Sequence, residues 1–236
     1  MFLKEELTRY NRQMMLPEIR AKGQEKLKLA RILVIGAGGL GCPVLQYLNA
    51  AGVGTIGIVD FDKIELHNLH RQILYHTNDV GKSKAHTAAE KLRSQNPHNT
   101  IHAFNEMLNE NNAETLIADY DIVVDGSDNF ATRYLVNDIC VKLGKTLVYG
   151  TILTFEGQLA VFNYKGGKNL RDIYPEAPDP EDVPSCDENG VLGIVPGIIG
   201  TYMALFTLQI ILGTFENTNQ LHLINLRHPG LISLDF

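Results

Sequence analysis

The segment from residue 32 to residue 62, ILVIGAGGLGCPVLQYLNAAGVGTIGIVDFD, limits the possible folds more than any other part of the chain. An apolar run ends in glycines, a stretch with helical spacing follows, and a second apolar run ends in acidic residues. This pattern predicts a β-strand, a helix and a parallel β-strand. Gly36, Gly38 and Gly41 stand where the first strand turns into the helix, and Asp60 stands at the end of the second strand.

A nucleotide fits this arrangement for physical reasons. Glycine lets the backbone approach phosphate, the N-terminus of a helix offers free N–H groups, and a carboxylate accepts hydrogen bonds from ribose hydroxyls. The motif alone is compatible with NAD, FAD and ATP. The structural alternative is a glycine-rich turn that is needed only for tight helix packing.

The alternation of strand and helix continues along the chain. Helices are expected at 83–97, 112–120 and 132–144, and strands at 100–107, 121–128, 146–153 and 157–164. Continuous apolar strands between helices predict an α/β fold: a Rossmann-like, parallel-centred sheet with helices on both faces. A chain of 236 residues fits one domain. We expect a helical arm over 1–28, a nucleotide-binding part over 29–150, and a further part over 151–236 with a proline-rich loop at 165–190.

Composition argues against several classes of partner. The formal net charge is -6 and no run of basic residues is present, so nucleic-acid binding is not expected. Three cysteines without paired spacing build neither a disulfide framework nor a four-cysteine zinc site. The first residues carry charges where a signal peptide has an apolar core, which favours a cytoplasmic location.

Residues 191–214 carry no charge and are long enough to span a bilayer. Pro196 and four glycines favour a different structure, namely a tight turn followed by a shorter helix over about 201–212. An α/β domain of this size needs at least one helix that is apolar on all sides. We therefore predict a buried helix and no membrane partner.

The stretch LHNLHRQILYHTNDVGKSKA, residues 66–85, favours chemistry at phosphate. A hydride-transfer enzyme needs an uncharged surface beside its nicotinamide, whereas phosphoryl or nucleotidyl transfer needs cations around the phosphates. Arg71 and Lys84 meet that need, and Asn68 and Gln72, four residues apart, share one face of a helical turn. The alternative is a solvated loop in which such residues have no task.

Several motifs together resemble one family, the bacterial E1-like adenylyltransferases of the ThiF/MoeB/HesA type. They are RYNRQMMLPEI, GAGGLGCPVLQYLNAAGVGTIGIVDFD, NLHRQILY, VGKSKA, VVDGSDNFATRYLVND, FEGQLAVF and CDENGVLGIVPGIIGT. The resemblance implies an E1-like adenylation domain, with an antiparallel extension of the sheet toward the C-terminus, and a cytoplasmic nucleotidyltransferase. It would use ATP and Mg²⁺ to adenylate the C-terminal glycine carboxylate of a ubiquitin-like sulfur carrier ending in Gly-Gly. Residues 151–236 would face that carrier, and the enzyme would be a homodimer.

The resemblance also assigns roles to residues. Asp60 would hold the ribose, Arg71 and Lys84 would neutralise the triphosphate, Asp128 would bind Mg²⁺, and Arg12 would act in the partner subunit's site. The implied nucleotide-binding set is Gly36, Gly38, Gly39, Gly41, Asp60, Asp62, Asn68, Arg71, Gln72, Lys84, Asp128 and Asn129. The alternatives are an ordinary surface residue for Arg12 and a helix N-cap for Asp128.

The cysteines divide into two kinds. Cys186 lies in the loop before the glycine-rich turn, where the family has a cysteine used in sulfur transfer, and a loop cysteine without a task is the alternative. This match favours the thiamine branch, in which the carrier is ThiS-type, over the molybdopterin branch with its MoaD-type carrier. Cys42 and Cys140 are most simply core residues.

Two departures from the family pattern bear on cofactors and docking. Many relatives carry two CxxC pairs for zinc, but the first position reads NLRD, from Asn169 to Asp172, and no C-terminal pair exists. We therefore predict no structural zinc. Met203 and Phe206 stand where relatives usually have Gln and Glu, which puts in doubt how the carrier or the partner subunit docks.

Other functions remain open from the sequence. An NAD-dependent oxidoreductase is favoured only by the glycine loop and Asp60, and it gives Arg71, Lys84 and Asp128 no task. A catalytically silent partner subunit would normally lack the arginine finger or the metal-binding aspartate, and both are present here. Within the enzyme class, the substrate carboxylate could instead belong to a small peptide or to a tRNA-linked group.

Overall fold

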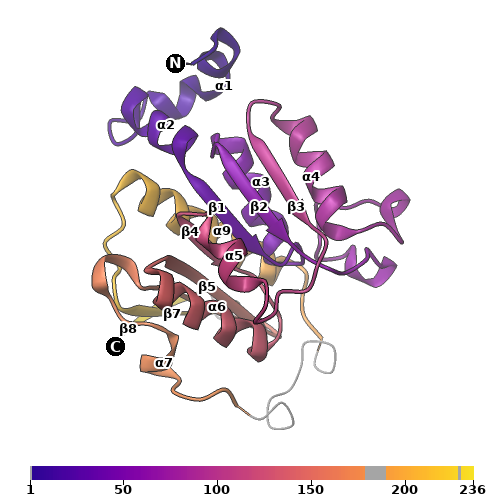
Figure 1. Ribbon diagram of the computed structural model, residues 1–236, viewed down its shortest axis with the longest axis vertical. Coiled ribbons are helices and arrows are strands. Elements are labelled where there is room, and N and C mark those ends of the chain that lie inside the picture. The colour runs from indigo at the N-terminus through magenta and orange to yellow at the C-terminus, as the bar shows by residue number, and fades with distance from the viewer. Residues whose placement is uncertain (1, 179–189, 228–229) are drawn as a thin grey trace.

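One eight-stranded sheet forms the centre of the protein, as the computed structural model in Figure 1 shows. The structure describes residues 2–178, 190–227 and 230–236. The strand order is β3-β2-β1-β4-β5-β6-β7-β8. Neighbours from β3 to β5 are parallel, and those from β5 to β8 are antiparallel. The strands are β1 Arg31–Ile35, β2 Thr55–Val59, β3 Thr100–Phe104, β4 Ile122–Asp125, β5 Thr146–Leu153, β6 Glu156–Phe162, β7 Gln220–Asn225 and β8 Gly230–Asp235.

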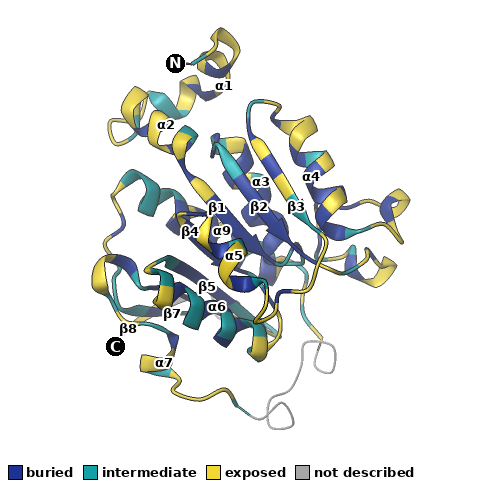
Figure 2. Cartoon of the chain, viewed as in Figure 1, coloured by how far each residue is buried: buried dark blue, intermediate teal, exposed yellow. Residues whose placement is uncertain are grey.

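Helices cover both faces of this sheet. One core joins α3, α4 and α9 to one face, and a second core joins α5 and α6 to the other. The central strands β1, β2 and β4 are buried, whereas the helices expose their outer sides (Figure 2). The helices are α1 Lys4–Met14, α2 Arg20–Leu29, α3 Gly41–Ala51, α4 Lys84–Gln95, α5 Ala113–Ala118, α6 Phe130–Leu143, α7 Leu170–Ile173 and α9 Ile194–Leu212. The short 3₁₀ helices are η1 Leu66–Asn68, η2 Thr77–Asp79 and η3 Tyr164–Gly166.

The predicted α/β fold with its antiparallel extension is confirmed. Local signals account for where the helices begin and end. Ser83 caps α4, since its hydroxyl accepts a hydrogen bond from the N–H of His86. Asn129 caps α6 in the same way through Thr132, so this helix begins two residues before the predicted 132–144. It ends at Gly144, which has a φ of 62°.

The prediction for residues 191–214 was wrong in one respect. In place of a turn and a short helix, a single helix, α9, runs for 19 residues from Ile194. Pro196 lies in its first turn, where a missing N–H breaks no helical hydrogen bond. Gly200 lies where α9 packs closely on the start of α3, since a Cβ there would overlap the carbonyl oxygen of Leu40. Gly200 thus permits this helix packing.

Helix α9 is long and apolar enough to cross a membrane by length and composition alone. It packs against the sheet and α3 instead, and fewer than half of the residues in its most apolar window are buried, 44%. The sequence predicts a helix that is buried on all sides, whereas α9 is exposed to solvent along one face, here called its open face. Ile194, Thr201 and Leu205 are exposed along that face.

Met203 and Phe206 do not lie on the open face. Both are buried. Met203 packs against Gly150 of β5, where any side chain at residue 150 would collide with its sulfur. Phe206 stacks edge-on with Phe215 at 5.2 Å between ring centres. Both residues therefore face the sheet.

Part of the predicted loop at 165–190 has regular structure. The 3₁₀ turn η3 and the one-turn helix α7 lie within it. Asn169 and Asp172, which stand where relatives have zinc cysteines, cap α7. The Asn169 side chain accepts from the N–H of Arg171, and Asp172 accepts from the N–H of Asn169 at 2.7 Å. Cys186 lies outside the described residues.

His222 of β7 is a buried imidazole at the back of the antiparallel strands. It is 3% exposed, its Nδ1 lies 2.7 Å from Ser233 Oγ on β8, and its ring packs on Phe206. Among the described residues its Nε2 has no hydrogen-bond partner. Burial lowers the pKa of His222 below the ordinary value of 6.5.

We expect His222 to make folding sensitive to mild acid. The folded state holds the neutral ring, so its contribution to stability is present above about pH 6.5 and declines as the pH falls below that unfolded-state pKa. Thermal unfolding midpoints at pH 7.5 and pH 5.0 measure the effect, and His222→Gln should show the smaller drop between the two. An equal drop in the variant and the parent protein would contradict this assignment.

Candidate active site

Two loops meet at the carboxyl ends of the parallel strands. The chain turns from β1 into α3 through residues 36–41, and from β4 into α6 through residues 126–129. Because β1 and β4 are neighbours, the loops touch. A Cβ added at Gly36 would lie 3.0 Å from the carbonyl oxygen of Gly126. Open α/β sheets bind ligands at such a point, where the order of the strands reverses.

Glycine is required in the first loop. Gly36 has a φ of 86°, a conformation that side chains disfavour. A Cβ at Gly41 would overlap the carbonyl oxygen of Gly36. The tight turn brings the N-terminus of α3 to the edge of the sheet, where backbone N–H groups and the helix dipole favour an anion.

Asp60, at the end of β2, is fixed by backbone donors. One carboxylate oxygen accepts from the N–H of Ala37 at 2.8 Å, and the other accepts from the N–H of Asp62 at 2.9 Å. Burial raises the pKa of Asp60, while the Ala37 N–H and the charge of Lys84 act in the opposite direction. Each oxygen keeps a further lone pair, which suits the acceptance of ribose hydroxyls.

The predicted cations stand on the same side of the site. Lys84, the first residue of α4, is buried and forms an ion pair with Asp62 at 2.8 Å. Among the described residues, Arg71 makes its hydrogen bonds without a carboxylate. Its Nη1 lies 3.3 Å from the carbonyl oxygen of His67, to which it donates, and 2.9 Å from Nε2 of His70. Its remaining N–H groups suit an anionic ligand.

Asp128 is not the helix cap that the alternative interpretation proposed. Asn129 caps α6, with its side-chain oxygen 2.8 Å from the N–H of Thr132. Asp128 is exposed in the loop before it. A carboxylate placed this way can bind Mg²⁺ together with phosphate oxygens. Within the described ranges, no group of three or more His, Cys, Asp or Glu residues could hold a metal.

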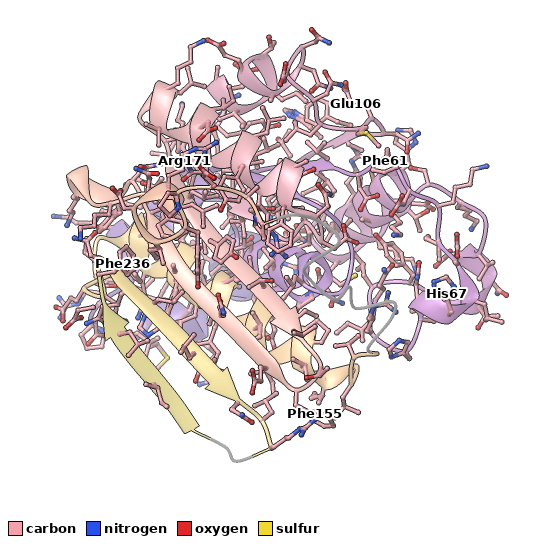
Figure 3. All side chains as sticks on the ribbon, turned by 90° about the horizontal axis from the view of Figure 1, so that it is seen from below. Phe61, His67, Glu106, Phe155, Arg171 and Phe236 are labelled. Atoms are coloured by element: carbon pink, nitrogen blue, oxygen red, sulfur yellow. The ribbon has the colours of Figure 1, made fainter. Side chains whose placement is uncertain are left out.

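A cleft of about 1500 Å³, the strand-end cleft, joins these residues. Its nucleotide side is lined by Gly36, Gly38, Gly39, Asp60, Asp62, Arg71, Gln72, Lys84, Asp128 and Asn129. Its other side runs over β5, β6 and β7, past Thr151, Gln158 and Leu223. Seen from below, Phe61, Glu106 and His67 lie on the right of the molecule, Arg171 and Phe236 on the left, and Phe155 at the bottom (Figure 3). The lining of the cleft thus reaches from the glycine loop to the antiparallel strands.

Three predicted residues do not line this cleft in the structure. Gly41 lies behind the loop, where it permits close packing. Asn68 is buried, and its side-chain oxygen accepts from the N–H of Glu65 at 3.4 Å. Arg12 is exposed on α1, in the arm at the top of Figure 1, away from the strand ends. Gln72, by contrast, lines the cleft, and among the described residues its buried Oε1 has no partner.

Arg133 lines the cleft and is buried, but no role was predicted for it from the sequence. It stands in the quoted motif VVDGSDNFATRYLVND, on a helix that is otherwise largely apolar on its inner side. A charged residue at a position that faces the sheet was the signal that could have identified it.

Comparison with known proteins places this site in a family. The model of the ThiF family matches residues 10–233, so the chain belongs to the ThiF family. It is 51% identical over 215 residues to the "Sulfur carrier protein adenylyltransferase" of Thermus thermophilus, covering 89% of this chain and 79% of that protein. It is 50% identical over 212 residues to the "Probable molybdopterin-synthase adenylyltransferase" of Porphyra purpurea, covering 89% of this chain but 55% of that protein. The predicted nucleotidyltransferase class is thereby confirmed.

Solved structures confirm the E1-like fold. The E. coli protein MccB in complex with MccA superposes with a TM-score of 0.84 at 21% identity, over 96% of this chain and 71% of that chain. PaaA superposes with a TM-score of 0.79, also at 21% identity, over 99% of this chain and 74% of that chain.

We expect Gly41→Ala to disrupt the nucleotide loop. The added methyl group collides with the Gly36 carbonyl, and overpacking of this kind costs about 1–3 kcal/mol. ATP affinity, measured by calorimetric titration, should fall by about tenfold or more. Gly197→Ala is the matched control, since a Cβ there has nothing within 4 Å. In a helix this change should stabilise the protein by up to about 1 kcal/mol. Normal ATP binding by a folded Gly41→Ala protein would contradict the assignment.

Proposed function

We propose that this protein uses ATP to adenylate the C-terminal glycine carboxylate of a ubiquitin-like sulfur carrier, with release of pyrophosphate. One observation carries the proposal: a single cleft joins a glycine loop and Asp60 to Arg71, Lys84 and Asp128, and it continues as an open groove over β5–β7. The first part suits a nucleoside triphosphate. The second offers a path for the end of a polypeptide. Relatives named as sulfur carrier and molybdopterin-synthase adenylyltransferases support this substrate class.

The reaction needs alignment and charge stabilisation and no covalent help from the protein. An oxygen of the carrier's carboxylate attacks the α-phosphorus, and the bond from that phosphorus to the bridging oxygen breaks, so that pyrophosphate leaves with the electron pair. Asp60 orients the ribose, and Arg71 and Lys84 stabilise charge on the phosphates. Asp128 would hold Mg²⁺, which supplies further neutralisation of the phosphates.

An NAD-dependent oxidoreductase explains less of the cleft. It accounts for Asp60 and the glycine loop but gives no task to Arg71 or Lys84 near the same ligand. Adenylation of a peptide or of a tRNA-linked carboxylate uses the same residues, and a silent partner subunit uses only the binding. These alternatives differ from the proposal in the second substrate, so substrate tests distinguish them.

ATP–pyrophosphate exchange, with and without candidate carriers ending in Gly-Gly, tests the proposal. Exchange that one carrier stimulates would support the reaction and would separate a ThiS-type from a MoaD-type carrier. Intact ATP binding without exchange with any carrier would overturn the carrier proposal in favour of another carboxylate or a silent subunit.

Arg71→Ala, Lys84→Ala and Asp128→Ala should each reduce exchange by about 100-fold or more, because each removes charge stabilisation from the transferred phosphate. Circular dichroism should show an intact fold. Lys142→Ala is the control: this exposed lysine on α6 pairs with Glu114 outside the cleft, at 2.6 Å, and its loss should leave exchange unchanged. Wild-type turnover in any of the three variants would remove that residue from the mechanism.

Arg12 should act in the partner subunit of a homodimer. Arg12→Ala and Lys84→Ala should each be inactive alone, and mixing the two should restore exchange to about one quarter of the wild-type rate. Half of the randomly mixed dimers contain one of each chain, and each of these has one intact site. Subunit exchange is driven by denaturation and refolding of the mixture. No recovery from a mixture shown to contain mixed dimers would argue that Arg12 acts within its own chain or not at all.

A further inference from the structure

Arg133 is a buried cation in the wall of the strand-end cleft. It lies in the first turn of α6 and is 7% exposed. Its guanidinium carbon lies over two aromatic rings, 5.5 Å from the centre of Phe130 and 5.6 Å from the centre of Tyr149. The rings and the backbone contacts restrict the orientation of the guanidinium.

Among the described residues, hydrogen bonds use only some of the N–H groups of the Arg133 side chain. Nε and Nη2 donate to the carbonyl oxygen of Ser127, at 3.3 and 2.9 Å. These two bonds use two of the five N–H groups of a guanidinium. Over the ranges that the structure describes, no other hydrogen bond to the Arg133 side chain is found, and no carboxylate oxygen lies within ion-pair distance of it.

Asp125, at the end of β4, is a buried acid whose charge interacts with that of Arg133, although no ion pair joins the two side chains. It is fully buried, its Oδ1 accepts from the N–H of Ser127 at 2.9 Å, and its Oδ2 has no hydrogen-bond partner among the described residues. Burial raises the pKa of Asp125, and the charge of Arg133 partly offsets that effect. A buried cation that has no directly bonded carboxylate lowers the stability of the folded protein, unless a bound ligand supplies the opposite charge.

Arg133 lies at the junction of the two sides of the cleft. Tyr149 pairs with Asp125 of the parallel strands and with Ala160 of the antiparallel strands. Ser127, which accepts from Arg133, directly precedes Asp128. Lys84 and Arg71, the other two cationic residues among those lining the cleft, stand toward the glycine loop.

We propose that Arg133 binds the terminal carboxylate of the polypeptide substrate and orients it for attack. This inference rests on the proposed function. A planar guanidinium with N–H groups to spare matches a carboxylate in a two-point hydrogen bond. The groove over β5–β7 brings the end of an extended chain toward this position, while the glycine loop, Lys84 and Arg71 hold the phosphates.

The chemistry is consistent with this role. One carboxylate oxygen forms the new bond to the α-phosphorus, and the bond to the leaving pyrophosphate breaks. The other oxygen becomes the carbonyl oxygen of the acyl-adenylate. The carboxylate charge is lost in this step, so the contact with Arg133 weakens as the product forms. Arg133 would therefore favour the carboxylate form of the substrate over an uncharged end.

A carrier whose terminal carboxylate is replaced by a carboxamide provides the first test, on the unaltered enzyme with an ATP analogue whose α–β bridging oxygen is replaced by a methylene group, so that the carboxylate is not consumed. We expect the carboxylate carrier to bind about tenfold more tightly than the carboxamide carrier, since charge-assisted bonds are the stronger ones. In Arg133→Gln the two carriers should bind alike, and Arg133→Lys should keep part of the preference. Equal binding of both carriers by the unaltered enzyme would overturn the proposal without recourse to any variant.

Steady-state kinetics separate this role from a structural one. If Arg133 binds the carboxylate, Arg133→Gln raises KM for the carrier by about tenfold and changes KM for MgATP by less than about twofold. If Arg133 only holds the Ser127 carbonyl and the loop of Asp128, KM for MgATP rises at least as much, and the carboxylate preference survives in the variant. That pattern would refute the proposal.

Arg171→Gln is the matched control. Arg171 also packs on α6 and stacks over Tyr134, but its guanidinium forms a two-point ion pair with Asp138. Its loss should leave the carboxylate preference unchanged. If the unaltered enzyme shows no carrier-stimulated exchange, the proposed function and this inference fail together. If exchange is present and the preference persists in Arg133→Gln, only the role of Arg133 fails.

Discussion

The close contact between two loops is the constraint on which the site depends. Strands β1 and β4 are neighbours, so the turns that follow them must pass each other at the edge of the sheet. Gly36 and Gly41 leave room for this contact because a Cβ at either would press on backbone carbonyls. The same contact sets the N-terminus of α3 beside the loop of Asp128. The positions of the glycine loop and of Asp128 are thereby set by backbone packing.

Charge in the cleft is arranged for ligands more than for the protein itself. Lys84 has a carboxylate partner in Asp62. Among the described residues, Arg71 and Arg133 form no ion pair and instead donate to carbonyl oxygens or to a ring nitrogen. Buried or half-buried cations of this kind add little to folding, because desolvation offsets the attraction to distant acids. Under the proposed function, they would contribute free energy when an anionic substrate binds.

Helix α9 supports this site from behind the sheet. Its inner face carries Met203 and Phe206 into the core. Its outer face remains apolar and exposed at Ile194 and Leu205. The long apolar sequence of α9 therefore supplies both an inner face that packs in the core and an outer face that is exposed.

The sequence by itself determined the local structure: the alternation of strands and helices, the glycine turn, and the helix ends at Ser83 and Gly144. It also identified Asp60, Arg71, Lys84 and Asp128 as one chemical group, and the cleft contains all four. These features depend on the backbone preferences and the chemistry of residues that are close together in the sequence. The tertiary structure decided the rest. Asn68 lies outside the cleft lining, α9 begins seven residues early, and Arg133 meets Tyr149 and Ser127. Each of these features depends on which segments the strand order brings together. The spacing of residues along the chain does not give the distance between segments in the folded protein.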